Sequence, residues 1–398
     1  MRWRAFMAVA FALCLCFSTS SVPTPLYPIY EQHWNLPPSG LSYIFTSYMA
    51  AVMVALICFG RVSDTLGRYR TILISLAMLL CGLVLSAFAG GIVTLISGRF
   101  IIGFGNGLLT TAGVMALADA HPENDKRVAA VATSMAINLG FGFGPLISGA
   151  AAQPGIAPLV LPYAVIFVLA LVVCVLIFRS RDRLRVPGFV PARLSLRPEI
   201  TLPAKGRRAK FILACCGGFS NFMVGSIFFS LVPSLLITEL PWQGPLMVGL
   251  VYVPMALACI VIQLVYREIE PFKGLALGMV SFAICIALLA LGLLMDNALI
   301  VAGGILITGI GQGYIFMTSV VIAGMMADER RRAANMSTYF LSAYIGASVP
   351  IIGVGLLADR ITLKPAILIF CVLTLCYVLA LGYWAIRSRP RPTYNPAG

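Results

Sequence analysis

The sequence contains few charged residues. Lys, Arg, Asp and Glu together make up 11% of the 398 residues, whereas soluble globular domains carry about 25%. Segments such as 41–59 and 71–88 contain no charged residue at all. Because an apolar run of about 20 residues spans the hydrocarbon core of a bilayer, this composition excludes a soluble fold and predicts membrane-spanning helices throughout the chain.

Acidic and nucleophilic groups are also missing from the apolar runs. All 14 acidic residues and both histidines lie in loops or at the ends of predicted spans. No carboxylate cluster or nucleophile–base pair is visible at membrane depth, so we do not expect an enzyme. The 11 cysteines lie in apolar runs without a CxxC pair, which predicts buried thiols, no disulfides, no metal site and no cofactor.

Twelve apolar runs are long enough to cross a bilayer core of about 30 Å. We expect spans near residues 5–27, 41–59, 71–88, 92–117, 128–149, 158–178, 211–232, 245–266, 275–294, 298–324, 333–357 and 366–385.

Basic residues are distributed unevenly about these spans. Of the 28 Lys and Arg residues, 25 fall in segments on one side, Arg360 and Lys364 fall on the other, and Arg99 lies within a span. Cytoplasmic loops carry such an excess, so we expect both termini in the cytoplasm, in a multi-pass cell membrane protein that suits a bacterial inner membrane. The net charge of +14 is then a topological signal, and we expect no nucleic-acid partner.

The two halves of the chain repeat each other at an offset of 205–206 residues. Residues 103–107 (GFGNG) correspond to 309–313 (GIGQG), and 145–149 (PLISG) to 350–353 (PIIG). Residues 1–22 resemble a cleaved signal peptide, but the first span has a counterpart beginning at Phe211, which indicates a retained helix.

The duplication divides the chain into three parts. Residues 1–178 and 211–398 each hold six predicted spans, and the linker 179–210 between them holds ten basic residues and four prolines. The predicted fold class is therefore an all-α polytopic membrane protein with 12 transmembrane helices in two pseudo-symmetric six-helix bundles, a plan used by secondary transporters.

Three motifs resemble signatures of the major facilitator superfamily. Segment 60–68 (GRVSDTLGR) is similar to that family's signature between spans 2 and 3, and 95–107 (LISGRFIIGFGNG) to its span 4 signature. Segment 140–149 (GFGFGPLISG) is similar to the span 5 signature of its exporters and antiporters. The resemblance implies a monomeric transporter that works by alternating access. We expect efflux of a small organic molecule, with protons as a candidate coupling ion; uptake of a sugar or organic anion, or passive facilitation, is the alternative.

The charged hairpin after the second span is a candidate gating latch. Its glycines permit a tight turn, its aspartate can approach the N-terminus of span 11, where the helix dipole favours an anion, and its arginines can pair with an acid at the end of span 4. The resemblance implies the latch role for the aspartate and the first of these arginines; topogenic charge is the alternative. The proposed latch residues are Gly60, Asp64, Gly67, Arg68, Arg70 and Asp119.

Arg99 is the only ionised side chain predicted deep within a span. It shares a helix face with Gly103, Asn106 and Thr110, and we expect that face to line a water-filled cavity; snorkelling to the headgroups is the alternative. In the family such an arginine is tied to proton coupling. Because the spans contain no acid, we expect a neutral or anionic substrate.

Intramembrane amides on other spans can complete a polar cavity with Arg99, although each can equally serve helix packing. The predicted substrate and coupling cavity comprises Arg99, Asn106, Asn138, Asn221, Gln263 and Gln312. The antiporter-like motif, which we expect to permit close packing and a bend, comprises Gly140, Gly144, Pro145 and Gly149.

Overall fold

The computed structural model describes residues 2–60, 62–121, 123, 125–184, 200–239, 244–328 and 331–389. Within these residues all regular secondary structure is helical, and 12 helices are long and apolar enough to cross a membrane. The predicted fold class is confirmed. The middle of the linker, residues 185–199, and the side chain of Asp64 lie outside the described part.

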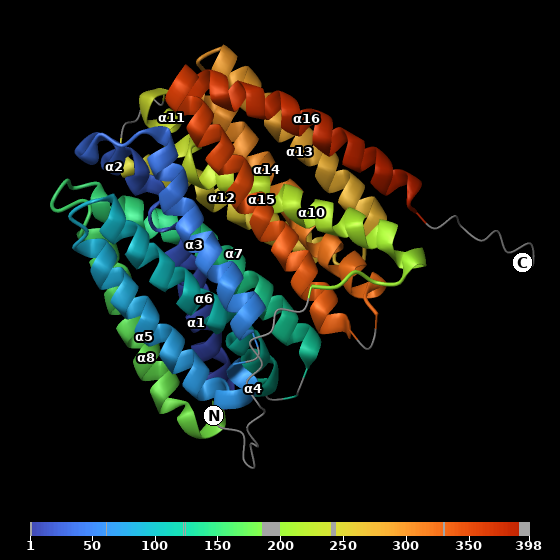
Figure 1. Ribbon diagram of the computed structural model, residues 1–398. Coiled ribbons are helices and arrows are strands. Elements are labelled where there is room, and N and C mark those ends of the chain that lie inside the picture. Colours follow the sequence, from blue (N-terminus) through green and yellow to red (C-terminus); the bar gives the residue numbers. More distant parts are fainter. Residues whose placement is uncertain are drawn as a thin grey trace, which may run out of the picture.

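The described residues of the first half form nine α-helices and one short 3-10 helix (Figure 1). They are α1 (Arg2–Ser21), η1 (Thr24–Leu26), α2 (Tyr27–Trp34), α3 (Pro38–Phe59), α4 (Val62–Leu66), α5 (Arg68–Ala87), α6 (Ile92–Ala120), α7 (Lys126–Ala152), α8 (Leu161–Arg179) and α9 (Arg181–Leu184).

The second half follows the linker. It consists of α10 (Lys205–Ser230), α11 (Val232–Glu239), α12 (Pro245–Val265), α13 (Pro271–Leu294), α14 (Ala298–Met326), α15 (Arg332–Ile361) and α16 (Leu363–Arg387).

Proline and glycine set several helix boundaries. Pro38, Pro245 and Pro271 each occupy the first position of a helix, where the missing N–H is not needed. Gly67 joins α4 to α5 at φ +80°, and Gly244 precedes α12 at φ +131°. These two positions need glycine because side chains with a Cβ rarely adopt such angles.

The first span differs from the expected single helix over 5–27. Helix α1 ends at Ser21, and the chain then continues through η1 into α2. Pro23, Pro25 and Pro28 lie in this stretch, and each removes a backbone donor from the helical pattern. The break leaves carbonyl groups at the end of α1 that need partners from elsewhere.

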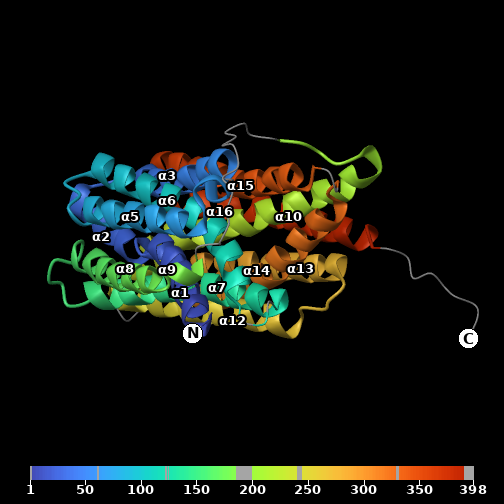
Figure 2. The ribbon, with the colours of Figure 1, turned by 90° about the horizontal axis from the view of Figure 1, so that it is seen from below.

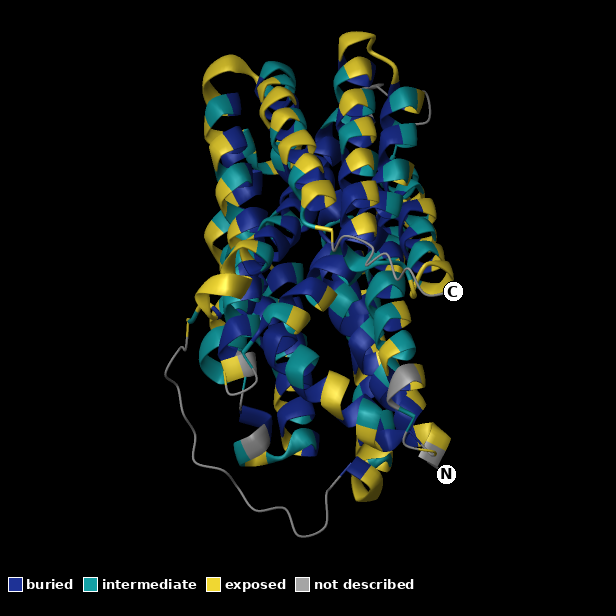
Figure 3. Cartoon of the chain, turned by 90° about the vertical axis from the view of Figure 1, so that its right-hand side faces the viewer, coloured by how far each residue is buried: buried dark blue, intermediate teal, exposed yellow. Residues whose placement is uncertain are grey.

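The helices form two bundles, seen along different directions in Figures 1 and 2. In the first bundle α6 packs on α1, α3 and α5; in the second α14 packs on α10, α12 and α13. Figure 3 shows exposed residues along the outer helix faces and buried ones between the helices. Exposed side chains such as Leu373 and Val265 are apolar, as expected of helices that face lipid.

Two antiparallel helix pairs join the bundles: α7 packs on α12, and α3 packs on α15. We call the end of the molecule that holds α4 and both borders of the linker the linker end, and the opposite end, with α2 and α11, the far end. Near the far end a Cβ on Gly249 would lie 2.9 Å from the backbone carbonyl carbon of Pro145, and a Cβ on Gly149 would lie 2.9 Å from that of Pro245. Small residues therefore let the two backbones approach closely here.

Within the second bundle, Gly309 provides the same kind of approach. A Cβ at Gly309 would lie 2.8 Å from the backbone carbonyl carbon of Met255 in α12, whereas a Cβ at Gly303, in the same helix, would have no atom within 4 Å.

We predict that Gly309→Ala lowers the thermal unfolding temperature of the purified protein by several degrees, because α12 and α14 must separate. Gly303→Ala is the matched control. It should leave stability unchanged or raise it, since alanine favours a helix over glycine by about 1 kcal/mol. Equal effects of the two substitutions would contradict this packing.

Candidate functional site

The Arg99 side chain lies in the interior of the first bundle, where its partners are carbonyl oxygens rather than a carboxylate. Nη1 donates to the Thr19 carbonyl at 3.0 Å, and Nη2 donates to the Ser20 carbonyl at 2.9 Å. The guanidinium carbon also lies 4.6 Å from the centre of the Tyr48 ring, a favourable cation–π distance. Arg99 is thus held by α1 and α3 together.

These contacts explain how a buried arginine is tolerated. The Ser18 carbonyl still accepts from the Val22 N–H at 3.0 Å. Pro23, however, lacks the N–H that would pair with the Thr19 carbonyl, and α1 ends at Ser21, so the carbonyls after Ser18 are left for other donors. The C-terminal end of a helix also carries partial negative charge. Arg99 therefore donates hydrogen bonds to the free carbonyls at the break in the first span. The partial negative charge of these carbonyls in turn compensates the positive charge of Arg99.

Asn106 extends the same network by two turns of α6. Its Nδ2 atom donates to the Cys16 carbonyl at 2.8 Å, to Thr19 Oγ1 at 3.1 Å and to the Tyr48 hydroxyl at 3.1 Å. Arg99 and Asn106 are 0% and 1% exposed. The expectation that this face of α6 lines a water-filled cavity is therefore wrong for these two residues, because α1 and α3 cover them.

Asn138 and Gln263 meet across the two bundles. Asn138 Nδ2 donates to Gln263 Oε1 at 3.3 Å, and the Ser134 hydroxyl donates to the same oxygen. Both amides are partly exposed. They form a polar bridge between α7 and α12, on the linker-end side of the glycine contacts described above.

Asn221 and Gln312 belong to the second bundle. Asn221 is 8% exposed, and its Oδ1 atom has no hydrogen-bond partner within the described part of the chain. A Cβ on Gly225, one turn further along α10, would lie 2.8 Å from Gln312 Nε2. Of the six predicted cavity residues, Arg99 and Asn106 are buried in the first bundle, and convergence of the other four on a single site stays a prediction.

Aromatic side chains fill the face between the bundles instead. Ring centres lie 5.3 Å apart for Phe17 and Phe141, 5.6 Å for Phe141 and Phe229, and 4.9 Å for Phe229 and Tyr252. These rings come from α1, α7, α10 and α12 and form what we call the aromatic seam. No pattern in the sequence indicates this seam, because aromatic residues in apolar spans do not differ from ordinary core or lipid-facing residues.

The hairpin contains one of the predicted contacts. Arg68 pairs with Asp119 and donates to the Met115 carbonyl at 3.3 Å. Gly67 has the expected positive φ, whereas Gly60 has an ordinary helical φ of −58°. Arg70 is exposed, and no ion pair of Arg70 is found within the described residues. Helix α4, which carries Asp64, packs on α5 and α6 of its own bundle.

The N-terminus of α15 holds residues that sequence analysis missed. Asn335 is buried, and its Oδ1 atom accepts from the Asp328 N–H at 2.9 Å while its Nδ2 atom donates to the Thr201 carbonyl at 2.9 Å. The Thr201 N–H donates to Thr338 Oγ1 at 3.1 Å. The last residues of the linker are therefore fastened to the start of α15, close to the place where Asp64 was expected to dock.

The antiporter-like motif faces two helices. Cβ atoms on Gly140 and Gly144 would lie 3.0 Å or less from backbone atoms of Ser18 in α1, so these glycines bring α7 against α1 within the first bundle. Pro145 and Gly149 instead contact α12 in the other bundle, as described above. Within the described residues no group of His, Cys, Asp and Glu could hold a metal ion.

A family model described as Major Facilitator Superfamily matches residues 9–349. The chain belongs to this superfamily. The predicted membership of this superfamily is thereby confirmed. In this chain the twelve helices form two bundles that contact each other through α7–α12 and α3–α15.

Curated relatives of this chain within the superfamily differ in how much they cover. The multidrug efflux protein YfmO of Bacillus subtilis is 22% identical over 367 residues, which are 90% of this chain and 87% of YfmO. The uncharacterized MFS-type transporter EfpA of Mycobacterium tuberculosis is 28% identical over 152 residues. The riboflavin transporter RibZ of Clostridioides difficile is 23% identical over 148 residues. Each of these two shorter matches covers 37% of this chain, but only 29% of EfpA and 32% of RibZ.

Solved structures share the fold. A peptide transporter POT in complex with sulfate superposes with a TM-score of 0.82 at 15% identity, over 97% of this chain and 94% of that one. A bacterial homolog of the human lysosomal transporter Spinster, in an inward-facing and occupied conformation, gives 0.73 at 13% identity, over 96% of each chain. At these identities the likeness shows the fold alone.

We predict that Arg99→Lys destabilises the protein by about 1–3 kcal/mol, because an ammonium group does not reproduce the paired donors of a guanidinium and leaves a buried carbonyl unpaired. Tyr48→Phe, which keeps the ring but removes the hydroxyl, should cost less. Thermal unfolding followed with a thiol-reactive dye measures both, since unfolding exposes the buried cysteines. Wild-type stability of the lysine variant would show that the paired geometry is not needed.

Proposed function

We propose that the protein is a secondary transporter that exports a small organic molecule by alternating access. The packing between the bundles carries this proposal: α7 meets α12 and α3 meets α15, with close backbone approach at Gly149 and Gly249 toward the far end, and alternating access would separate these pairs there. The similarity to the multidrug efflux protein YfmO along 90% of the chain supports export as the direction.

The orientation follows from the distribution of charge. In the sequence, 25 of the 28 basic residues fall in segments on the side of the linker, so the positive-inside rule favours a cytoplasmic linker end with both termini there; we propose a bacterial inner membrane as the location. The far end would then face outward. Substrate would enter from the cytoplasm while the far end is closed and leave once the far end opens.

The substrate class follows from the chemistry of the face between the bundles. The aromatic seam offers flat apolar surfaces, and the amides of Asn138, Gln263 and Gln312 offer neutral hydrogen-bonding groups beside it. The spans contain no acid that would balance a cationic substrate. We infer a neutral or anionic aromatic compound as substrate.

Proton coupling and passive facilitation remain two candidate modes. Arg99 is not a candidate for coupling, because its guanidinium is held by the Thr19 and Ser20 carbonyls inside the first bundle. The lack of an acid within the spans is the specific observation that favours facilitation. Residues at the helix ends, such as Glu31 and Asp64, are the candidates for coupling.

We propose that the hairpin latches the linker end when that end closes. The Arg68–Asp119 ion pair holds the hairpin against α6, and Gly67 provides the positive φ of its turn. Arg70 and Gly60 are the remaining residues of the proposed latch. Asp64 would then approach the N-terminus of α15, whose N-cap residue Arg331 has no acceptor in its side chain. An anion near that end would be favourable.

We predict that the purified full chain in proteoliposomes transports neutral and anionic fluorescent aromatic compounds but not cationic ones. Accumulation above the external concentration under an imposed pH gradient would indicate antiport; equilibration alone would indicate facilitation. Empty liposomes serve as the control. Transport restricted to cationic compounds would contradict the proposed substrate class.

For the latch, we predict that Asp64→Asn slows transport about two- to fivefold, because a charge at a helix end contributes about 0.3–1 kcal/mol. Arg70→Gln, which removes a charge from the same hairpin, should have a smaller effect. Turnover per inserted molecule is the measurement. A normal rate for correctly inserted Asp64→Asn would exclude the latch.

A further inference from the structure

Helices α3 and α12 begin in the same unusual way. Each has proline at its first position, Pro38 and Pro245, and the residue before it, Pro37 or Gly244, has no side-chain oxygen. Helices normally satisfy their first free N–H groups with a Ser, Thr, Asp or Asn side chain at that preceding position. Neither helix can do so, and the N–H of the second residue of each helix therefore needs a partner from elsewhere in the protein.

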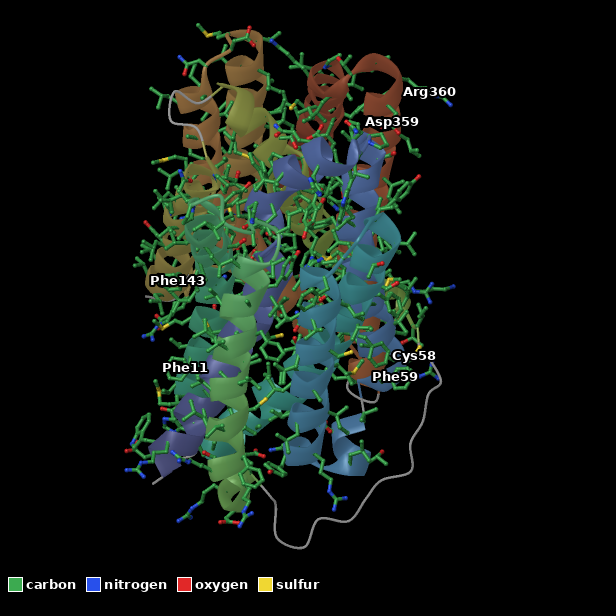
Figure 4. The ribbon with its side chains drawn as sticks, turned by 90° about the vertical axis from the view of Figure 1, so that its left-hand side faces the viewer. Phe11, Cys58, Phe59, Phe143, Asp359 and Arg360 are labelled. Carbon is green, nitrogen blue, oxygen red and sulfur yellow. The ribbon has the colours of Figure 1, made fainter. Side chains whose placement is uncertain are left out.

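Both N–H groups are satisfied by the opposite bundle. The Ser39 N–H of α3 donates to Asp359 Oδ1 at 3.1 Å, and the Leu246 N–H of α12 donates to Gln153 Oε1 at 3.2 Å. Asp359 belongs to the last turn of α15, and Gln153 directly follows α7. Figure 4 shows Asp359 and Arg360 at the far end, beside the beginning of α3.

The two contacts are equivalent under the internal repeat of the sequence. Gln153 and Asp359 are 206 residues apart, the same offset that relates Gly103 to Gly309, and the donors Ser39 and Leu246 are 207 residues apart. The geometry around each is tight: a Cβ on Gly355 would lie 3.0 Å from Ser39 Cα, and a Cβ on Gly149 would lie 3.0 Å from Leu246 Cα. One arrangement thus occurs twice, built from different residues.

We propose that Gln153 and Asp359 are gating residues, a symmetric pair of helix caps supplied in trans that hold the far end closed. This inference rests on the proposed alternating access. Opening the far end must separate α3 from α15 and α12 from α7, so both helix starts lose their caps in the same movement. With only one of the two caps present, the other helix pair would lack the hydrogen bond that opposes its separation.

The two caps differ in charge. Gln153 offers a neutral amide oxygen, whereas Asp359 offers a carboxylate that also interacts with the positive end of the α3 dipole. A charge-assisted hydrogen bond is stronger than a neutral one, and at an exposed position salt weakens it. Raising the ionic strength should therefore weaken the Asp359–Ser39 contact between α15 and α3, and should leave the Gln153–Leu246 contact at the start of α12 unchanged.

The test measures the far-end distance in the full chain in lipid nanodiscs. Spin labels carried by noncanonical residues at Phe88 and Leu299, both 74% exposed at the far ends of α5 and α14, avoid the native cysteines. Electron–electron double resonance then gives the ratio of open to closed populations without any substrate.

Asp359→Ala and Gln153→Ala should each raise the open-to-closed ratio about fivefold, the equivalent of about 1 kcal/mol for a helix cap. Asp359→Asn should raise it less, since the amide still accepts. Gln153→Glu should lower the ratio, an outcome that misfolding would not produce. Raising the salt concentration should open the wild type but not Asp359→Asn. Arg360→Gln, which removes a charge from the same turn, is the control.

The proposal is overturned if both alanine variants keep the wild-type ratio, if Arg360→Gln matches Asp359→Ala, or if no variant populates an open state. Failure of the proposed function is a separate result: variants that shift the ratio as expected, in a protein that transports none of the tested compounds, would refute transport of those compounds and support the caps.

Discussion

The structure depends on one constraint: in a bilayer every backbone N–H and C=O group needs a partner inside the protein. This chain has 24 prolines, several of which begin or break membrane helices, and each leaves an unpaired group nearby. Arg99 pairs with the carbonyls at the break of α1, Asp359 and Gln153 with the starts of α3 and α12, and Asn335 with the Thr201 carbonyl at the end of the linker. These polar side chains serve backbone groups, and of them only Arg99 was singled out from the sequence.

Close backbone approach is the second requirement. Gly140 and Gly144 bring α7 against α1 within one bundle, while Gly149 and Gly249 bring α7 against α12 between the bundles. The antiporter-like motif of α7 therefore contacts both the end of α1 and the beginning of α12.

The sequence predicted most of the fold but little of the site. Apolar run length gave twelve spans, and the repeat related α7 to α15 and α3 to α12. The turn at Gly67 and the pairing of Arg68 with Asp119 were also foreseen, because they are local or join adjacent helices. The Arg99 face was assigned to a cavity wrongly, since helical periodicity shows that Arg99 and Asn106 share a face but not which helix covers it. Convergence of the remaining amides on one cavity also depends on packing between helices and stays a prediction.

The sequence by itself determined the class of the protein, because hydrophobic length, charge distribution and family motifs are properties of linear order. Only the tertiary structure decided which polar groups meet. Gln153 and Asp359 are unremarkable loop-end residues in the sequence, and the prolines before Ser39 and Leu246 read as ordinary helix starts. Their pairing appears only when segments 320 and 93 residues apart in the sequence are packed antiparallel, because a hydrogen bond depends on distances in space that no local pattern encodes.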